Sequence, residues 1–366
     1  MAARGKDPQC GEDHSIHFRS DGLALSPVEY ARLLARLAGS GRIVADEFSR
    51  DGIVTQLEER IAAMLGKEAA VFLPSGTLAN HLALRLLARN GRRVLVQRES
   101  HIYNDAGDCV QELSGLVLIP LAPERATFDL AEAAAEVARA GEGRVATPVG
   151  AISIESPVRR VVGEVFDFTE MQRIAAFARD QGIGLHLDGA RLFLAHPYTG
   201  IAPRTYAALF DTVYISLYKY FNAASGAVLA GSSRLLDNLY HQRRRFGGGL
   251  RQAWPYAAVA LHYLDGFSER FGHAAAAADN LFAALREHGR CEIVRPAAAT
   301  NVTRLRVRGG DAARLPERLL EHGVAIRQAL HTAAGAAEFE LFTNETILRR
   351  PLAETIGAFV KALGSV

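Results

Sequence analysis

The sequence predicts an α/β fold, in which a large domain built on a mostly parallel β-sheet is followed by a smaller α+β domain. Between about residues 70 and 230, short apolar runs alternate with amphipathic helical stretches, which is typical of the crossover units of a parallel sheet. After Gly231 the pattern changes to long helical segments and then to strand-like pieces separated by helices. This change of pattern predicts the second domain.

Seven apolar runs are expected to form the strands of the large domain, because each is short and adjoins a helical pattern. Two of the amphipathic stretches between them, 77–91 and 169–182, end in a glycine of the kind that closes a helix. The runs are AAVFLPSG (69–76), RRVLVQ (92–97), GLVLIP (115–120), GAISIE (150–155), GIGLHLD (182–188), TVYISL (212–217) and SGAVLAG (225–231).

The C-terminal part is expected to contain a long helical region, four strand-like pieces and two more helices. The helical region is 253–289, the strand-like pieces are 291–296, 301–309, 324–328 and 338–342, and the helices lie at about 311–322 and 351–363. We therefore predict a tail at 1–17, an N-terminal segment at 18–50, a large domain at 51–265 and a small domain at 266–366.

The composition excludes several classes of protein. A net charge of +2 in 366 residues gives no basis for a nucleic-acid or membrane partner. Three widely spaced cysteines, Cys10, Cys109 and Cys291, fit neither a disulfide framework nor a zinc site, so no metal is expected. The first residues lack the apolar core of a signal peptide, and no apolar stretch has membrane length. We expect a soluble, cytoplasmic protein.

Polar residues lie at the predicted carboxyl ends of four strands, and ligands of α/β sheets bind at these ends. Ser75, Gly76 and Thr77 lie between a strand and a helix, where small residues, two hydroxyls and a helix N-terminus suit a phosphate group. An ordinary helix cap has the same pattern, so this motif alone leaves both interpretations open.

Three further strand ends carry ionisable residues. His101 follows one strand, and a single histidine in such a place is more often a hydrogen-bonded loop residue than a catalytic one. Asp188 ends another strand with Arg191 three residues on, so an ion pair that fastens the loop is an alternative to a ligand contact. Lys219 ends a third strand among aromatic residues, which favours a desolvated, nucleophilic amine over a snorkelling lysine only when the other motifs are considered.

Together the four strand ends supply the parts needed to hold pyridoxal phosphate. Lys219 can form a Schiff base with the aldehyde, the Ser75–Thr77 turn can hold the phosphate, and His101 can stack on the ring. Asp188, a costly charge at the end of a buried strand, would then have a pyridinium as its partner.

At this point the sequence resembles the L-threonine aldolase/β-eliminating lyase family of fold-type I pyridoxal-phosphate enzymes. The likeness runs from about Phe18 to the C-terminus. It rests on six motifs in order: FRSD (18–21), FLPSGTLAN (72–80), ESHI (99–102), HLDGARLF (186–193), SLYK (216–219) and GGGLRQA (247–253).

The resemblance implies a role for each matching residue. It supports the roles given above to Lys219, Asp188, His101 and the Ser75–Thr77 turn, and assigns Arg191 to the cofactor's phenolic oxygen or the substrate carboxylate. Ser20 would also touch that carboxylate. Such enzymes are homodimers or homotetramers with active sites at a subunit interface, so Arg244 and Arg251 would face the cofactor phosphate of a neighbouring chain.

The implied reaction is retro-aldol cleavage of a β-hydroxy-α-amino acid, such as L-threonine or L-allo-threonine, to glycine and an aldehyde. His101, or a water that it orients, is the candidate base for the β-hydroxyl proton. A β-eliminating lyase that releases ammonia and a keto acid is the alternative, and a weakly catalytic pyridoxal-phosphate-binding homologue is another.

Departures from the family pattern bear on the substrate. Glu340 stands where the family usually has an arginine that grips the carboxylate, and Arg327 would either replace that arginine or pair with Glu340 and leave the carboxylate to Arg191. Phe48 takes the place of a tyrosine near the phosphate. Arg159 and Arg160 are added after Glu155, where our default interpretation is solvated loop charges. These changes favour a bulkier or more anionic substrate than threonine.

Overall fold

A computed structural model describes residues 15–89, 91–333 and 335–364 of the chain, which form two compact units. The large unit comprises 21–272 and 295–303, and the small unit the described residues of 1–20, 273–294 and 304–366. The small unit thus includes an N-terminal piece that the sequence pattern did not assign to it. Most of the predicted tail at 1–17, with Cys10, lies outside the described residues.

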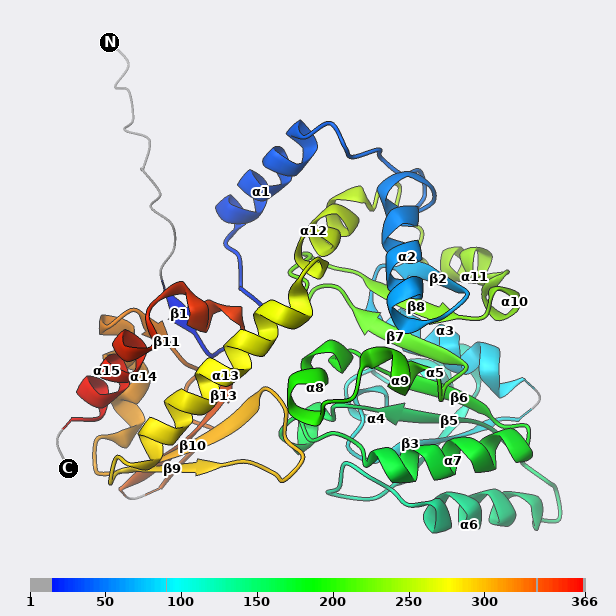
Figure 1. The fold of residues 1–366 in the computed structure, drawn as a ribbon. Coiled ribbons are helices and arrows are strands. Elements are labelled where there is room, and N and C mark those ends of the chain that lie inside the picture. The colour runs from blue at the N-terminus through cyan, green and yellow to red at the C-terminus, as the bar shows by residue number, and fades with distance from the viewer. Residues whose placement is uncertain (1–14, 90, 334, 365–366) are drawn as a thin grey trace. The chain divides into compact units, whose positions relative to one another are not determined.

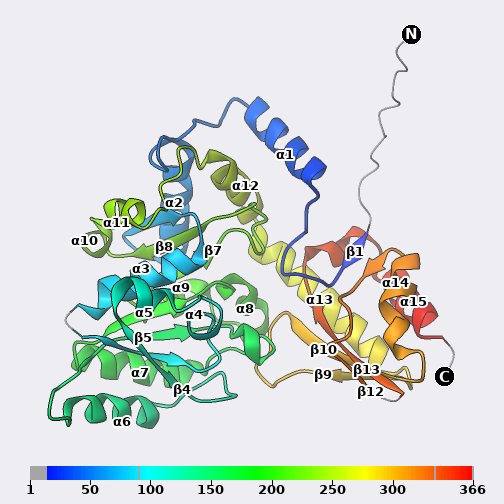
Figure 2. The same cartoon turned by 180° about the vertical axis from the view of Figure 1, so that it is seen from behind.

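The large unit is organised around a seven-stranded sheet, shown in Figures 1 and 2, whose spatial order is β2-β8-β7-β6-β5-β3-β4. The strands β4, β3, β5, β6 and β7 are parallel, whereas β8 runs antiparallel to both β7 and β2. All seven predicted strands are confirmed: β2 (Ala69–Leu73), β3 (Arg93–Gln97), β4 (Val117–Leu121), β5 (Val149–Glu155), β6 (Gly184–Asp188), β7 (Thr212–Ser216) and β8 (Ala227–Gly231).

Helices cover this sheet, and α3 (Gly76–Ala88) packs on the central strands β5 to β8. Its start is set by Ser75, whose hydroxyl accepts a hydrogen bond from the backbone N–H of Leu78. The other helices of the large unit are α1 (Pro27–Gly39), α2 (Gly52–Leu65), α4 (His101–Asn104), α5 (Cys109–Ser114), α6 (Leu130–Gly141), α7 (Phe168–Asp180), α8 (Leu192–Thr199), α9 (Pro203–Ala207), α10 (Ser233–Leu236), α11 (Leu239–Arg245) and α12 (Trp254–Leu264).

The two predicted helix-closing glycines behave differently. Gly182 follows α7 with φ +66°, and its N–H donates to Arg179, as expected of a C-terminal cap. Gly91 was predicted to close α3, and this is wrong, because α3 ends at Ala88. Gly91 is needed for another reason: a Cβ there would lie 2.6 Å from the backbone of Gly150, so the two chain segments touch.

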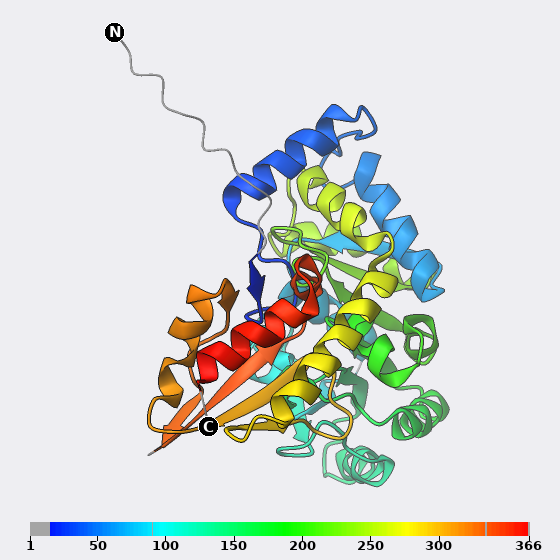
Figure 3. The same ribbon diagram turned by 60° about the vertical axis from the view of Figure 1, so that its left-hand side comes forward.

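The small unit contains a four-stranded sheet in the order β12-β13-β10-β9. Helix α13 (Phe267–Arg286) begins in the large unit and ends in the small one; Figure 3 shows it with α15 (Leu352–Leu363) in front of these strands. The remaining elements are β1 (Ile16–His17), β9 (Cys291–Val294), β10 (Val302–Arg308), α14 (Leu315–Glu321), β11 (Val324–Ala325), β12 (His331–Ala333), β13 (Ala336–Phe342) and α15 (Leu352–Leu363).

Two further sequence expectations concern the cysteines and membrane-spanning segments. Cys109 and Cys291 are both free thiols. Within the described ranges, no helix combines the length and the apolar character needed to cross a membrane.

Candidate active site

A cavity of about 380 Å³ lies at the carboxyl ends of the parallel strands in the large unit. It brings together residues that follow β2, β3, β5, β6 and β7, which is the end of an α/β sheet where ligands bind. Its walls include Ser75, Gly76, Thr77, Asn80, His101, Asp105, Glu155, Arg159, Arg160, Asp188, Ala190, Arg191, Tyr214, Tyr218 and Lys219. All seven site residues that the sequence placed after the ends of β2, β3, β6 and β7 therefore line one cavity.

A larger hollow of about 810 Å³ lies near the opposite ends of the strands, around Lys67, Asp211 and Gly231. It contains none of the predicted site residues. Since ligands of α/β folds bind beyond the carboxyl ends, the smaller cavity is the candidate active site.

The Ser75–Thr77 turn is both a helix cap and a wall of the cavity. Ser75 caps α3 through its hydroxyl, so the alternative interpretation of this motif is also correct. A Cβ at Gly76 would lie 2.0 Å from the hydroxyl of Tyr214, which shows that this position must stay without a side chain. Backbone amides at the start of a long helix, next to two hydroxyls, suit an anionic group.

Lys219 follows β7 and is half-buried beside two aromatic rings. Its Nζ lies 6.0 Å from the ring centre of Tyr214 and 5.5 Å from that of Tyr218. Burial, together with the Arg191 charge, lowers the pKa of the Lys219 amine to about 8. A lowered pKa favours the neutral, nucleophilic form of the amine, which is the property that the sequence analysis expects of a lysine among aromatic residues.

Asp188 is buried at the end of β6, and its carboxylate is fixed on both oxygens. Oδ2 accepts a hydrogen bond from Nδ2 of Asn80 at 2.5 Å, and Oδ1 accepts one from the backbone N–H of Ala190 at 3.1 Å. The alternative in which Asp188 pairs with Arg191 is wrong, because the partner of that guanidinium is Asp21.

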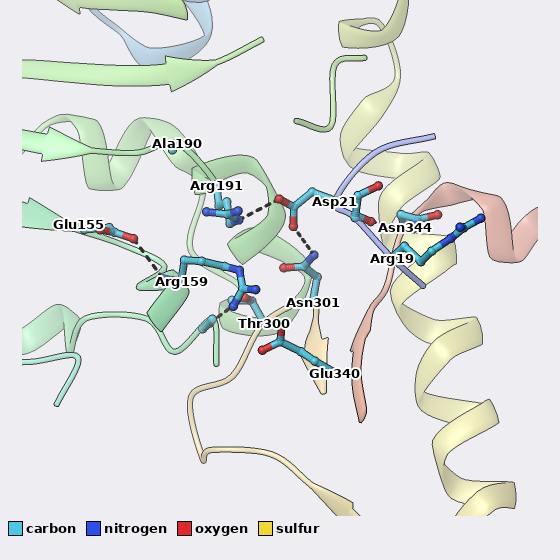
Figure 4. A network of polar contacts seen from close by, with 12 residues as sticks. Arg19, Asp21, Glu155, Arg159, Ala190, Arg191, Thr300, Asn301, Glu340 and Asn344 are labelled. Carbon is cyan, nitrogen blue, oxygen red and sulfur yellow. Dashed lines mark hydrogen bonds and ion pairs between the residues drawn. The ribbon is translucent and has the colours of Figure 1, made fainter. Parts of the chain in front are cut away.

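The ion pair between Asp21 and Arg191 is buried beside the cavity (Figure 4). Nε of Arg191 lies 2.9 Å from Oδ2 of Asp21, and Asn301 donates to the other carboxylate oxygen at 2.9 Å. Burial alone raises the pKa of Asp21, but Arg191 and Asn301 outweigh it and hold the pKa below its ordinary value. The sequence analysis missed Asp21 and Asn301, which lie far from Arg191 along the chain.

Replacing Asp21 by Asn removes the counter-charge of Arg191 and leaves the guanidinium buried. Loss of one partner of a buried ion pair costs about 3–5 kcal/mol, so we expect Asp21→Asn to lower the free energy of unfolding by roughly that amount. Urea unfolding at neutral pH measures the loss. Because the folded-state pKa of Asp21 is lowered, the stabilisation should also disappear in wild type as the pH falls through that value.

Asp105→Asn is the matched control for Asp21→Asn. It breaks the pair between Asp105 and Arg160, whose side chains are 42% and 43% exposed, so we expect a loss below about 1 kcal/mol. Equal losses in the two variants would contradict a special role for the buried pair.

His101 is the first residue of α4 and is half-buried in the cavity wall. Its backbone N–H donates to Oε2 of Glu155 at 2.6 Å, which fixes the start of α4. Its Nδ1 is buried and has no hydrogen-bond partner among the described residues. The ring is therefore held through its backbone, and one nitrogen stays available for a ligand.

Glu155 is a functional candidate that the sequence analysis missed. It ends β5 beside Asp188 on β6, and its second carboxylate oxygen accepts from the backbone N–H of Arg159 at 3.0 Å. Burial, and then the Asp188 charge, raise the pKa of Glu155 to about 7. The signal was present, because the GAISIE run ends in an acid just as the GIGLHLD run does.

Arg244 and Arg251 do not line this chain's cavity. Both are exposed, and their guanidinium groups lie 4.7 Å and 5.1 Å from the ring centre of Phe48. Arg251 also pairs with Glu47. Phe48, in place of the expected tyrosine, therefore holds two cations on its ring.

Ser20 and Arg327 belong to the small unit. The backbone carbonyl of Ser20 accepts a hydrogen bond from Asn344 at 2.9 Å. Arg327 donates from Nε to the carbonyl of Arg19 at 2.7 Å, and another guanidinium nitrogen lies 3.8 Å from Glu340. Of the two alternatives for Arg327, the structure contains the pair with Glu340.

The added arginines after β5 differ in exposure. Arg160 is exposed and paired with Asp105, in line with the default interpretation of loop charges. Arg159 is half-buried, and both arginines line the cavity.

The donor set of this cavity fits pyridoxal phosphate. Lys219 offers an amine with a lowered pKa, Asp188 a fixed carboxylate, and the start of α3 an anion-binding turn. His101 adds an aromatic ring whose Nδ1 has no hydrogen-bond partner among the described residues.

Comparison with known proteins identifies relatives of this chain. The sequence model of the beta-eliminating lyase family matches residues 42–307. The low-specificity L-threonine aldolase of Candida albicans is 31% identical over 221 residues, which are 60% of this chain and 58% of that enzyme. The corresponding enzyme of Saccharomyces cerevisiae is 31% identical over 58% of this chain and 55% of its own length. The matched segment thus spans little more than half of these curated relatives.

The fold is similar to that of a solved structure over nearly all of its length. A protein from Listeria monocytogenes EGD-E, provisionally named an L-allo-threonine aldolase, superposes with a TM-score of 0.80 at 26% identity. The similarity covers 95% of each chain. The predicted fold class, that of fold-type I pyridoxal-phosphate enzymes, is confirmed.

Proposed function

The chain belongs to the beta-eliminating lyase family, and from this premise we propose that it is a pyridoxal-phosphate-dependent lyase that cleaves a β-hydroxy-α-amino acid to glycine and an aldehyde. L-Threonine and L-allo-threonine are the reference substrates, after the names of the relatives. The observation that carries the proposal is the joint position of Lys219 and Asp188, which follow adjacent parallel strands and line one cavity.

The cofactor would be held by residues from four strand ends. We propose that Lys219 binds its aldehyde carbon, Asp188 its pyridine nitrogen, and the Ser75–Thr77 turn its phosphate, while His101 stacks on the ring. When bound, pyridoxal phosphate supplies an electron sink for the bond that breaks at the substrate's Cα.

The substrate carboxylate is assigned to Arg191. Asp21 holds the Nε side of this guanidinium, and the residue lines the cavity beside Lys219. Arg327, the other candidate, is engaged by the Arg19 carbonyl and by Glu340 within the small unit. The carboxylate-binding role of Ser20 rests on the family resemblance alone, because Ser20 is not among the residues that line this cavity.

His101 is proposed as the base that takes the β-hydroxyl proton, directly or through a water. His101→Phe keeps an aromatic ring for stacking but removes both nitrogens. We expect this variant to retain the visible band of the bound cofactor and to lose roughly 10²–10⁴-fold in kcat, the usual contribution of a general base. Absorption spectra and steady-state rates on threonine measure the two effects separately.

An unchanged kcat in His101→Phe would assign the proton transfer to another group. Tyr103→Phe is the matched control, because it changes an aromatic residue of the same short helix that does not line the cavity. It should change neither the spectrum nor the rate.

Products distinguish the proposed reaction from its alternatives. The purified protein, supplied with pyridoxal phosphate, is given threonine, allo-threonine, phenylserine and hydroxyaspartate. Equal amounts of aldehyde and glycine are the expected result. Ammonia with a keto acid would instead identify a β-eliminating lyase, and a cofactor band without either product would favour a weakly catalytic homologue.

We also propose that the protein is a homodimer or homotetramer and that it works in the cytoplasm. Arg244 and Arg251 are exposed and lie on the Phe48 ring, which suits cations lent to the cofactor phosphate of a neighbouring chain in a homodimer or homotetramer. The free thiols of Cys109 and Cys291 suit a reducing cytoplasm.

A further inference from the structure

A line of four buried side chains runs from the cavity into the core of the large unit. Asn80 donates from Nδ2 to Oδ2 of Asp188 at 2.5 Å, and its Oδ1 lies 2.9 Å from Nε2 of His186. Nδ1 of His186 lies 2.9 Å from the hydroxyl of Thr212. The four side chains come from α3, β6 and β7 and are at most 4% exposed.

The direction of each hydrogen bond follows from the chemistry of the groups. A carboxylate only accepts, so Asn80 must turn its NH₂ group towards Asp188 and its carbonyl oxygen towards His186. Nε2 of His186 must then carry a hydrogen. Burial lowers the pKa of His186 to about 4, against the opposing influence of Asp188, so at neutral pH the other nitrogen carries none.

Thr212 completes the line as a donor. Because Nδ1 of His186 is unprotonated, it accepts the hydrogen of the Thr212 hydroxyl. Every hydrogen in the line therefore points towards Asp188, and the bonds polarise one another in the same sense.

We propose that Thr212 and His186 are positioning residues that act through Asn80 to hold the Asp188 carboxylate charged and oriented at the cavity. Hydrogen bonds donated to a carboxylate favour its ionised form, and a buried line of donors does so without solvent screening. The assignment of the pyridine nitrogen as the group that Asp188 faces rests on the proposed function; the direction of the line does not.

Neither positioning residue touches the cavity itself. Thr212 is the first residue of β7, and neither Thr212 nor His186 is among the residues that line the cavity. Packing alone would be satisfied by valine at position 212, which has the shape of threonine without its hydroxyl. The hydroxyl therefore separates an electrostatic role from a structural one.

The first test needs no cofactor. Nitrogen-15 NMR of the apo-protein with labelled histidine reports which ring nitrogen of His186 is protonated, and His186→Asn identifies the signal by its loss. We expect the Nε2–H form at neutral pH. The Nδ1–H form, or a charged ring, would overturn the proposed direction of the line.

The second test compares Thr212→Val with Thr212→Ser in the presence of pyridoxal phosphate labelled at its ring nitrogen. In Thr212→Val the Asp188 carboxylate loses part of the stabilisation from the line and becomes a stronger acceptor for the ring N–H. The pH at which the bound ring nitrogen deprotonates should therefore rise by roughly half a unit. Thr212→Ser keeps the hydroxyl and should titrate as wild type does. Identical titrations of wild type and Thr212→Val would overturn the proposal.

The histidine NMR signal and the titration of the ring nitrogen can both be measured without any turnover of substrate. A protein that shows the Nε2–H form and the titration shift, but releases no aldehyde, would retain the positioning line and lose the proposed aldolase function. Should Thr212→Val fail to fold, the histidine measurement on wild type still decides the direction of the line.

Discussion

Lys219→Ala is expected to abolish the visible absorption band that the protein acquires with pyridoxal phosphate, and to lower kcat on threonine by on the order of 10³-fold or more. The reason is that Lys219 is the one lysine among the described residues that line the cavity, and that its lowered pKa favours the nucleophilic form of the amine. Spectral titration with the cofactor and steady-state rates measure the two losses.

Lys219→Arg separates charge from nucleophilicity in the same test. It keeps a cation near Asp188 and Tyr218 but cannot attack an aldehyde at neutral pH, because a guanidinium does not lose its proton there. It should fail as Lys219→Ala does. An unchanged cofactor band in either variant would refute the assignment of Lys219.

Asp188→Asn is expected to lower kcat by roughly 10²–10³-fold, the loss typical of removing one preorganised electrostatic contact at a reaction centre. The amide keeps the size of the side chain and can still accept the N–H of Ala190, but it carries no charge and presents an NH₂ group or a less basic oxygen to Asn80. Since Lys219 is untouched, the visible band should persist.

Retention of the band with loss of rate is what distinguishes Asp188→Asn from Lys219→Ala. Asp105→Asn is the control, because it removes an exposed carboxylate from the rim of the same cavity. A wild-type rate in Asp188→Asn would remove Asp188 from the proposed machinery, and equal losses in both variants would indicate a general effect of cavity charge.

The strand ends were predictable because two local patterns coincide there. Alternation of apolar runs and helical stretches located all seven strands, and a polar residue after an apolar run marked each functional end. Parallel strands present their carboxyl ends at one edge, so residues as distant as Ser75 and Lys219 were expected to meet, and they do. The same rule, applied to β5, would have found Glu155.

Partners that depend on long-range geometry could not be predicted in this way. Asp21 pairs with Arg191 and bonds to Asn301, but no periodicity connects three positions so far apart. The interpretation of Arg191 as a partner of Asp188 failed because sequence proximity was taken for spatial pairing. Gly91 was misread for a similar reason, since the contact that requires it comes from Gly150.

Unit boundaries depend on the same long-range geometry. Residues 295–303 return to the large unit after a stretch in the small one, and residues 15–20 group with the C-terminal segments. The predicted boundary between residues 265 and 266 divides the chain once, so it cannot describe segments that cross from one unit to the other and back. The short strands β1 and β12 were also not predicted, because two or three residues carry no periodic signal.

An ion pair in the small unit, between Arg327 and Glu340, bears on the proposed substrate. Glu340 and Arg327 pair with each other there, which is why we proposed Arg191, in the large unit, for the substrate carboxylate. Arg159 and Arg160 line the same cavity and add two more guanidinium groups to it. This arrangement keeps a more anionic β-hydroxy amino acid among the substrates to be compared with threonine.

The central claim is that Lys219 is the attachment point of pyridoxal phosphate, and chemical mapping tests it most directly. The chain has four lysines, Lys6, Lys67, Lys219 and Lys361, so a borohydride-reduced adduct can be assigned without ambiguity by mass spectrometry of its peptides. The account predicts a pyridoxyl phosphate group on Lys219 alone, at one per chain. A group on another lysine, or no group at all, would contradict it.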